Sequence, residues 1–119
     1  DTSALARLLD GETDVTSMAA RDALNAGDAH LPPVVLTELL SNPWIVETAV
    51  SFVSSVPLLE LFDGYWRRAA SLRADLKRRG LKAEVADCLI AQSCIDHDIP
   101  LITYDRDFRH FVPAGLQLL

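Results

Sequence analysis

The sequence is poor in the residues that define several common protein classes. It holds only two cysteines, one methionine and five glycines among 119 residues. Cys88 and Cys94 lie six positions apart in one expected helix, which suits neither a disulfide nor a zinc site. We interpret them as core thiols in a reducing compartment. No apolar run approaches the ~18 residues of a membrane span, and no charged-then-apolar leader is seen. We therefore expect a soluble, cytoplasmic protein with no membrane contact.

Basic residues are also scarce, with eleven Lys and Arg against seventeen Asp and Glu and a net charge of -6. A uniformly acidic surface would repel a polyanionic partner. However, seven of the eleven basic residues fall within residues 67–82. This stretch is either a solvated helix face or a ridge that contacts nucleic-acid phosphates. The candidates for phosphate contact are Arg73, Lys77, Arg78, Arg79 and Lys82.

Helical and extended patterns alternate along the chain. Amphipathic or apolar segments ended by glycine or proline predict helices at 4–9, 18–25, 34–41, 45–55, 65–79 and 84–97. The last of these is apolar almost all round and should be buried. Short apolar runs predict strands at 57–61, 101–103 and 116–119. The length fits one domain, residues 1–119. We predict an α/β fold with a short parallel sheet between layers of helices.

The polar residues at the helix starts predict how these helices are capped. We expect caps from Thr2 or Ser3, from Thr16 or Ser17, and from Asp63. The chain opens directly on Asp1-Thr-Ser, a polar segment with no strand before it. Such a segment is expected at the end of a strand, so we expect that the first strand of the domain is absent from this chain.

Four carboxylates are attached to elements that pack inward. Asp1 precedes a helix, Glu38 lies among leucines, Asp87 lies in the apolar helix, and Asp105 follows a core strand. Asp87 is the most informative, because burying an ionised Asp costs several kcal/mol unless a cation or hydrogen-bond donors compensate. By contrast, the acidic residues of the polar turns are expected to be solvated. They are Asp10, Glu12, Asp14 and Asp28.

If the four carboxylates converge, each pair of charges 4 Å apart is unfavourable by about 4 kcal/mol at an effective dielectric near 20. No buried Lys or Arg is evident beside them in the sequence. Hard oxygen ligands suit Mg²⁺ or Mn²⁺, so we predict a divalent-metal site. Zinc is not expected, since His30, His97 and His110 share no ligand spacing with one another or with the cysteines.

Four segments, in this order, carry a resemblance to a known family. They are Asp1-Thr-Ser, Leu36-Thr-Glu38-Leu-Leu, Ala86-Asp87-Cys-Leu-Ile-Ala91 and Leu101-Ile-Thr-Tyr-Asp105-Arg-Asp107-Phe. Together they resemble the motifs of PIN domains, and the size and helical middle resemble the VapC toxins of toxin-antitoxin pairs. The resemblance implies a three-layer α/β/α fold and a metal-dependent endoribonuclease. It also implies an RNA substrate, a cognate VapB-type antitoxin and a homodimer.

The resemblance also implies roles for individual residues. Asp1, Glu38, Asp87 and Asp105 would be the metal-binding and catalytic carboxylates, with Asp107 a less certain fifth. Ser3 and Thr103 would be their polar neighbours. The mechanism implied is in-line attack of an activated water on a phosphodiester.

Other interpretations of the same residues stay open. Asp1 could serve only as a favourable charge at a helix N-terminus, and Glu38 could be an exposed residue of an amphipathic helix. One of Asp105 and Asp107 could bind metal while the other caps the turn toward Phe108. The alternative function is a non-catalytic PIN-like module that binds RNA or protein. A phosphotransfer domain is disfavoured, because no lysine follows a late core strand.

Overall fold

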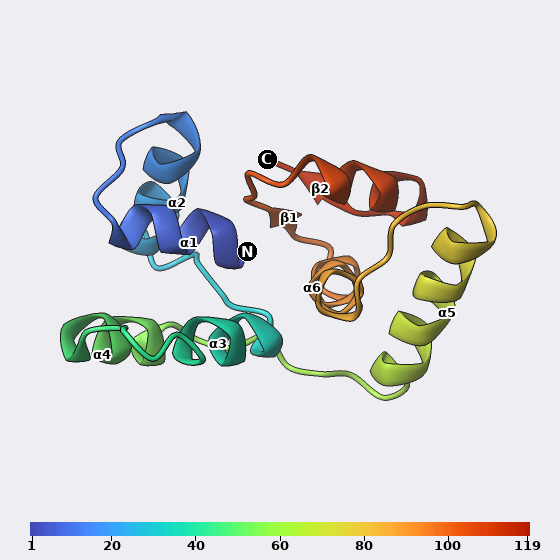
Figure 1. Ribbon diagram of the computed structural model, residues 1–119, viewed down its shortest axis with the longest axis horizontal. Coiled ribbons are helices and arrows are strands. Elements are labelled where there is room, and N and C mark those ends of the chain that lie inside the picture. Colours follow the sequence, from blue (N-terminus) through green and yellow to red (C-terminus); the bar gives the residue numbers. More distant parts are fainter.

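A computed structural model describes all residues, 1–119, as helices around a small parallel sheet. The helices are α1 (Thr2–Leu9), α2 (Val15–Asn25), α3 (Pro33–Leu40), α4 (Glu47–Ser55), α5 (Tyr65–Arg78) and α6 (Val85–Asp96). They are joined by β1 (Pro100–Leu101), the 3-10 helix η1 (Arg106–Ala114) and β2 (Gln117–Leu118). In Figure 1, α1–α4 gather on one side, and α5, α6, η1 and the strands gather on the other. None of these helices combines the length and apolar character needed to cross a membrane.

The sheet is parallel, as predicted, but it is shorter than predicted. β1 and β2 pair with Pro100 opposite Gln117 and Leu101 opposite Leu118. The strand expected at 57–61 is reduced to one parallel bridge, in which Leu58 lies opposite Leu31. The predicted α/β architecture is confirmed. The strands are short because a ladder extends only where a neighbouring strand is present, and the two pieces of sheet do not touch.

A groove of about 440 Å³ separates the two pieces, and twelve of its seventeen lining residues are hydrophobic. One wall is the edge at Leu31, whose N–H donates to Pro57 (2.9 Å) and whose C=O accepts from Leu59 (2.8 Å). In an extended strand, successive residues direct their backbone groups to opposite sides. His30, which lines the groove, therefore presents its N–H and C=O to it, whereas Pro32 has no N–H and its C=O accepts from Val35 at 2.9 Å.

The opposite wall of the groove is the free edge of β1. The carbonyl of Leu101 accepts from Leu119 at 3.0 Å on the β2 side. By the same alternation, Ile102 presents its backbone groups to the groove, and Pro100, which has no N–H, presents its carbonyl. The α-amino group of Asp1 takes one of them, donating to the Ile102 carbonyl at 2.7 Å. The groove thus lies between two sheet edges and ends at Asp1.

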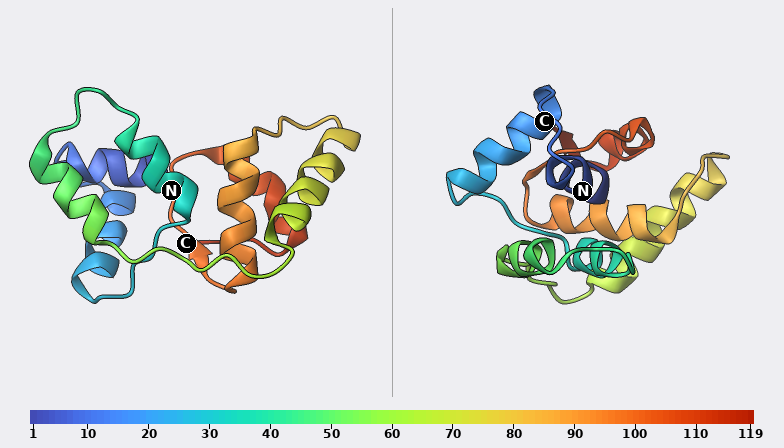
Figure 2. Two further views of the ribbon diagram at one scale, coloured as in Figure 1. Left: turned by 90° about the horizontal axis from the view of Figure 1, so that it is seen from below. Right: turned by 60° about the vertical axis from the view of Figure 1, so that its left-hand side comes forward.

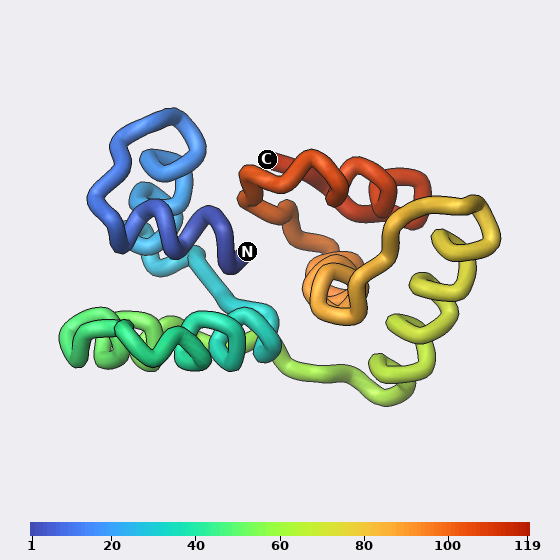
Figure 3. Tube along the Cα trace, viewed as in Figure 1, coloured from blue at the N-terminus to red at the C-terminus, as the bar shows by residue number.

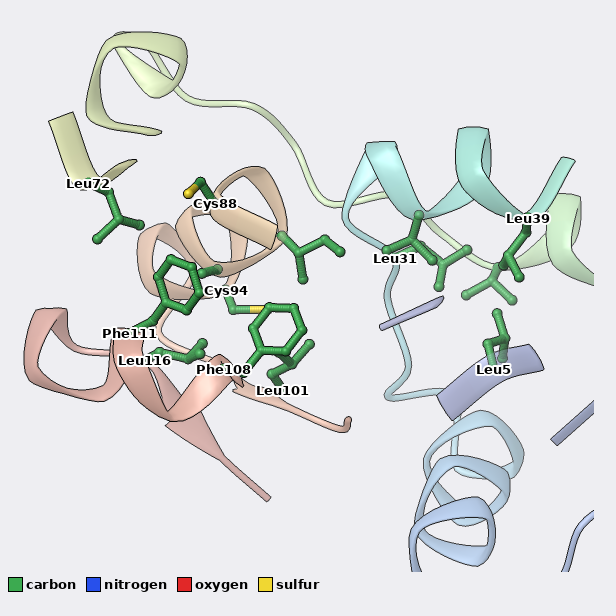
Figure 4. Packing of buried hydrophobic residues seen from close by; sticks show 14 of the residues in the cluster. Leu5, Leu31, Leu39, Leu72, Cys88, Cys94, Leu101, Phe108, Phe111 and Leu116 are labelled. Atoms are coloured by element: carbon green, nitrogen blue, oxygen red, sulfur yellow. The ribbon is translucent and has the colours of Figure 1, made fainter. Parts of the chain in front are cut away.

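The core is built around α6, which lies near the centre of the molecule. Figure 4 shows its buried side chains packed with those of η1 and α5, and a second group formed by Leu5, Leu31 and Leu39. The prediction of core thiols is confirmed, because Cys88 and Cys94 are free and buried. Burial raises the pKa of the Cys94 thiol to about 11. Neither cysteine is therefore a reactive thiolate at neutral pH.

Helix η1 is the one helix that the sequence patterns did not predict. Its Phe108 and Phe111 are almost fully buried, with ring centroids 5.8 Å apart. Pro113 lies inside the same short helix. Only two buried side chains and a tight 3-10 turn leave too little periodicity to identify a helix from sequence.

All three predicted helix caps are wrong. Asp1, not Thr2 or Ser3, caps α1 by accepting the N–H of Ala4 at 3.0 Å. Asp14, and neither Thr16 nor Ser17, caps α2. α5 starts after Gly64 at φ 80°, without a side-chain cap from Asp63. Ionised carboxylates accept stronger hydrogen bonds than hydroxyl groups, so α1 and α2 each begin earlier than predicted.

Part of the basic stretch holds α5 against α6. Arg68 binds Asp96 through two hydrogen bonds of 3.0 and 2.6 Å, and Gln92 donates to the same carboxylate at 2.8 Å. The Tyr65 hydroxyl adds a bond to the Leu89 carbonyl at 2.7 Å. Figure 3 shows the chain reaching α5 from α4 along a single connecting segment. The side-chain pairs therefore fix the placement of α5.

Candidate functional site

Asp1 lies where the start of α1 meets the end of β1. Its carboxylate accepts the Thr103 hydroxyl at 2.8 Å and the Ser3 hydroxyl at 2.9 and 3.0 Å, in addition to the Ala4 N–H. Figure 2 shows the N-terminus between the two halves of the molecule. The two predicted polar neighbours thus bind Asp1 directly. They join the first motif of the chain to the last.

The loop from β1 to η1 carries Asp105. Its N–H donates to the Thr103 hydroxyl at 2.9 Å, and its carboxylate accepts the Asp107 N–H at 2.8 Å. Asp105 is therefore the residue that caps the turn toward Phe108. Only one of its oxygens makes this bond, and a carboxylate oxygen can accept more than one donor or ligand. Capping and metal binding by Asp105 are compatible.

Asp87 lies in the first turn of α6 and is partly buried. Burial raises the pKa of Asp87 to about 6, and the charges of Asp105, Glu84 and Glu38 add to the increase. Lys82 acts in the opposite direction. The negative groups of α3, α6 and the β1–η1 loop are thus close enough to disfavour the ionisation of Asp87.

Glu38 lies exposed on α3, and its carboxylate accepts the Thr2 hydroxyl at 2.6 Å. Thr2 follows Asp1 directly, so this bond ties α3 to the start of α1. Sequence patterns suggested Thr2 only as a cap. Its actual role depends on a partner 36 positions away, which a local pattern cannot reveal.

Lys82 is the basic residue nearest the carboxylates. Its ammonium lies 3.3 Å from Glu84 and 3.9 Å from Asp107. The expectation of no buried Lys or Arg beside the carboxylates is not contradicted, because Lys82, which the α5–α6 turn brings near them, is exposed. Asp107 faces this lysine, which makes it a weaker candidate for metal binding than Asp105.

The other basic candidates differ in their surroundings. Arg73 donates to the Ala83 carbonyl at 2.8 Å, which ties it to the α5–α6 turn. Arg78 forms an ion pair with Asp75. Lys77 and Arg79 are exposed and make no ion pair. Of the five candidates, these two are the ones whose charge is free for another molecule.

The donor set can be compared with the needs of a metal ion. As the side chains stand, no three His, Cys, Asp or Glu residues are close enough to hold an ion together. All the gathered donors are carboxylates, the ligand type that Mg²⁺ and Mn²⁺ prefer. Burial is the main cause of the raised pKa of Asp87, and the charges of Asp105, Glu84 and Glu38 add to it. In donor chemistry, the residues fit a hard divalent cation.

The sequence matches the PIN domain family over residues 1–112. The chain belongs to the PIN domain family. This confirms the family predicted from the four motifs. PIN domains are generally metal-dependent nuclease modules, which agrees with a carboxylate cluster at the end of a parallel strand. A comparison with curated proteins found no match.

Proposed function

We propose that this PIN domain is a divalent-metal-dependent endoribonuclease and the toxin of a VapBC-type pair. One observation carries the nuclease proposal. The 2.8 Å hydrogen bond from Thr103 to Asp1 joins residues 102 positions apart and gathers the first and last acidic motifs at the end of β1. Asp87 lies close enough to Asp105 for the charge of Asp105 to contribute to the raised pKa of Asp87. Such a cluster serves hydrolysis of a phosphodiester better than binding of a polyanion alone.

The proposal gives each gathered residue a role. Asp1, Asp87, Asp105 and Glu38 would hold Mg²⁺ or Mn²⁺, with Asp107 secondary. When bound, such an ion supplies Lewis acidity for attack of water on the phosphate. Ser3 and Thr103 orient the Asp1 carboxylate through their hydroxyl groups. Lys82 lies beside the carboxylates as a phosphate contact.

The purified chain is expected to cleave structured RNA in Mg²⁺ or Mn²⁺, to stop in EDTA and to resume when the metal is restored. Cleavage is measured on end-labelled RNA by gel electrophoresis. Calorimetry with Mn²⁺ alone gives a second result, binding to the protein without any substrate. Cleavage that continues unchanged in EDTA would contradict the proposal.

The unpaired cations of α5 provide a prediction about RNA binding. Replacing both Lys77 and Arg79 by Ala should weaken binding and lower the slope of log K against log salt by about 1.4, since each contact contributes about 0.7 on a single strand. Fluorescence anisotropy in EDTA across a salt series measures this slope. Arg21→Glu on α2 is the control, because it changes the net charge by the same two units. An equal loss of RNA binding in the control would show that Lys77 and Arg79 belong to a solvated helix face and do not contact RNA specifically.

The proposed protein partners are a VapB-type antitoxin and a second copy of the chain. Exposed apolar side chains around α3 and α4 support a protein interface, since Trp44 is 85% exposed and Val46 63% exposed. Leu40 and Phe52 are also exposed there. A neighbouring reading frame that encodes a small DNA-binding protein would support the toxin role over a housekeeping nuclease.

A second candidate is a non-catalytic PIN-like module that binds RNA or protein. It is favoured by the absence of three carboxylates close enough to share an ion as the side chains stand. Calorimetry separates the two functions. The binding module predicts salt-sensitive RNA binding with no uptake of Mn²⁺, whereas the nuclease predicts both.

A further inference from the structure

The β1–η1 loop is held on two sides. On one side, Thr103 binds Asp1 and receives the N–H of Asp105. Tyr104, between them, donates its own N–H to the Ser3 hydroxyl at 3.3 Å. The Tyr104 side chain lies toward α1 and α2, where its ring meets Arg7 and its hydroxyl meets Asp14.

The Tyr104 hydroxyl binds the start of α2. It donates to the Asp14 carboxylate and lies 2.7 Å from the hydroxyl of the fully buried Ser17. Asp14 also accepts the N–H groups of Thr16 and Ser17 at 3.0 and 3.1 Å. The Tyr104 bond is the main cause of the lowered pKa of Asp14, about 2. Asp14 is exposed, as predicted for a solvated turn residue, and it is in addition an ionised acceptor held in place by these bonds.

The ring of Tyr104 is held as well as its hydroxyl. The guanidinium carbon of Arg7 lies 4.0 Å from the ring centroid, a cation–π distance. Arg7 belongs to α1 and is placed in turn by Glu12 at 3.5 Å. Tyr104 thus contacts both helices of the α1–α2 pair, while Thr103 beside it binds Asp1 and also accepts the N–H of Asp105.

We propose that Tyr104 is a positioning residue of the nuclease site, which holds Thr103 and Asp105 in place by anchoring their loop to Asp14. This inference rests on the proposed function. The loop between Leu101 and Phe108 has no buried side chain of its own. Its placement therefore depends on hydrogen bonds at its two sides. A carboxylate displaced by about 1 Å can cost a hundredfold in rate.

The variant that isolates the anchor is Tyr104→Phe, which keeps the ring against Arg7 and removes only the hydroxyl. We expect kcat for RNA cleavage to fall about tenfold, with KM for RNA changed less than about twofold. Asp14→Asn should act in the same direction, and the double variant should be no worse than the stronger single one. Tyr65→Phe is the matched control, since it removes a buried hydroxyl bond from the α5–α6 contact.

Hydrogen exchange provides a measurement that does not depend on catalysis. In Tyr104→Phe, the amides of Asp105 and Asp107 should exchange about tenfold faster than in the parent chain, whereas Tyr65→Phe should leave them unchanged. If these amides exchange at the same rate in Tyr104→Phe as in the parent chain, or change equally in both variants, the proposal that Tyr104 anchors the loop is wrong. If the parent chain cleaves no RNA, the proposed function fails. The exchange rates still show whether Tyr104 anchors the β1–η1 loop. A lower kcat with faster exchange establishes the positioning role.

Discussion

Asp87→Asn is expected to abolish RNA cleavage while making the folded chain more stable above pH 6. The side chain keeps its size, so α6 should form as before, but one carboxylate of the proposed metal site is lost. Even groups that only orient a metal ligand are typically worth 10- to 100-fold. We therefore expect the cleavage rate to fall by more than about 100-fold.

The gain in stability follows from the pKa of Asp87. That pKa rises on folding from an ordinary value of 3.8 to about 6, because burial and neighbouring carboxylates disfavour the charged form. Between these values the folded state binds more protons than the unfolded state, so the free energy of unfolding decreases as pH rises through this range. Above pH 6 the free energy of unfolding has lost this contribution in full and no longer changes with the charge of Asp87. Asn carries no charge, so the variant does not lose this stability.

Thermal unfolding at several pH values, without metal, tests this sign. The melting temperature of Asp87→Asn should match the parent near pH 4 and exceed it at pH 7.5. Asp22→Asn on the exposed face of α2 is the control for the same chemical change. Added Mg²⁺ should stabilise the parent and not the variant. An active Asp87→Asn, or one less stable than the parent at pH 7.5, would disprove this account of the site.

The sequence predicted the parts of the molecule that local patterns determine. Apolar periodicity located all six α-helices, and a lone acidic residue in the most apolar helix identified Asp87. Membership of the PIN domain family followed from motifs whose order is visible in one dimension. The caps of α1 and α2 were missed, because a nearby carboxylate competed with hydroxyl groups for the same N–H donors.

The parts that the sequence did not predict depend on distant partners. In the sequence, Tyr104 looks like one more residue at the end of an apolar strand. Only the fold shows that α2 places Asp14 at its hydroxyl. In the sequence, Lys82 is the last residue of a basic run. Only the fold shows that the α5–α6 turn places it beside Asp107. The bonds between Thr2 and Glu38 and between Thr103 and Asp1 likewise join residues far apart in sequence. Spacing alone cannot supply such pairs.

An apolar segment of five residues fused before Asp1 is expected to raise the melting temperature substantially. The groove between the two sheet edges is apolar and presents the backbone groups of His30 and the carbonyl of Pro100, with which an added strand could pair. Strands inside such sheets are buried on both faces and read as continuous apolar runs. Val-Val-Leu-Val-Ile is a suitable segment, because its side chains would fill the groove on both faces.

The fusion also removes a buried ionisable amino group. The α-amino group of Asp1 has its pKa lowered to about 6, chiefly by burial, which means that its charged form is disfavoured in the fold. In the extended chain this nitrogen becomes an amide N–H, which can keep the bond to the Ile102 carbonyl without a charge. The hydrogen bond from the Asp1 nitrogen to Ile102 would then be one of the backbone bonds between the added strand and β1.

The expected gain is about 2 kcal/mol, as burial of the apolar side chains exceeds the cost of ordering five residues. For a chain of this size, that corresponds to a rise in melting temperature of roughly 10 °C. Ser-Gly-Ser-Gly-Ser before Asp1 is the matched control, since it removes the same buried amino group but cannot fill the groove. Equal melting temperatures for the two fusions would show that only the loss of this amino group matters. A rise confined to the apolar fusion would show that the two pieces of sheet are joined by a strand between β1 and Leu31, ending at the carboxylate that begins the site.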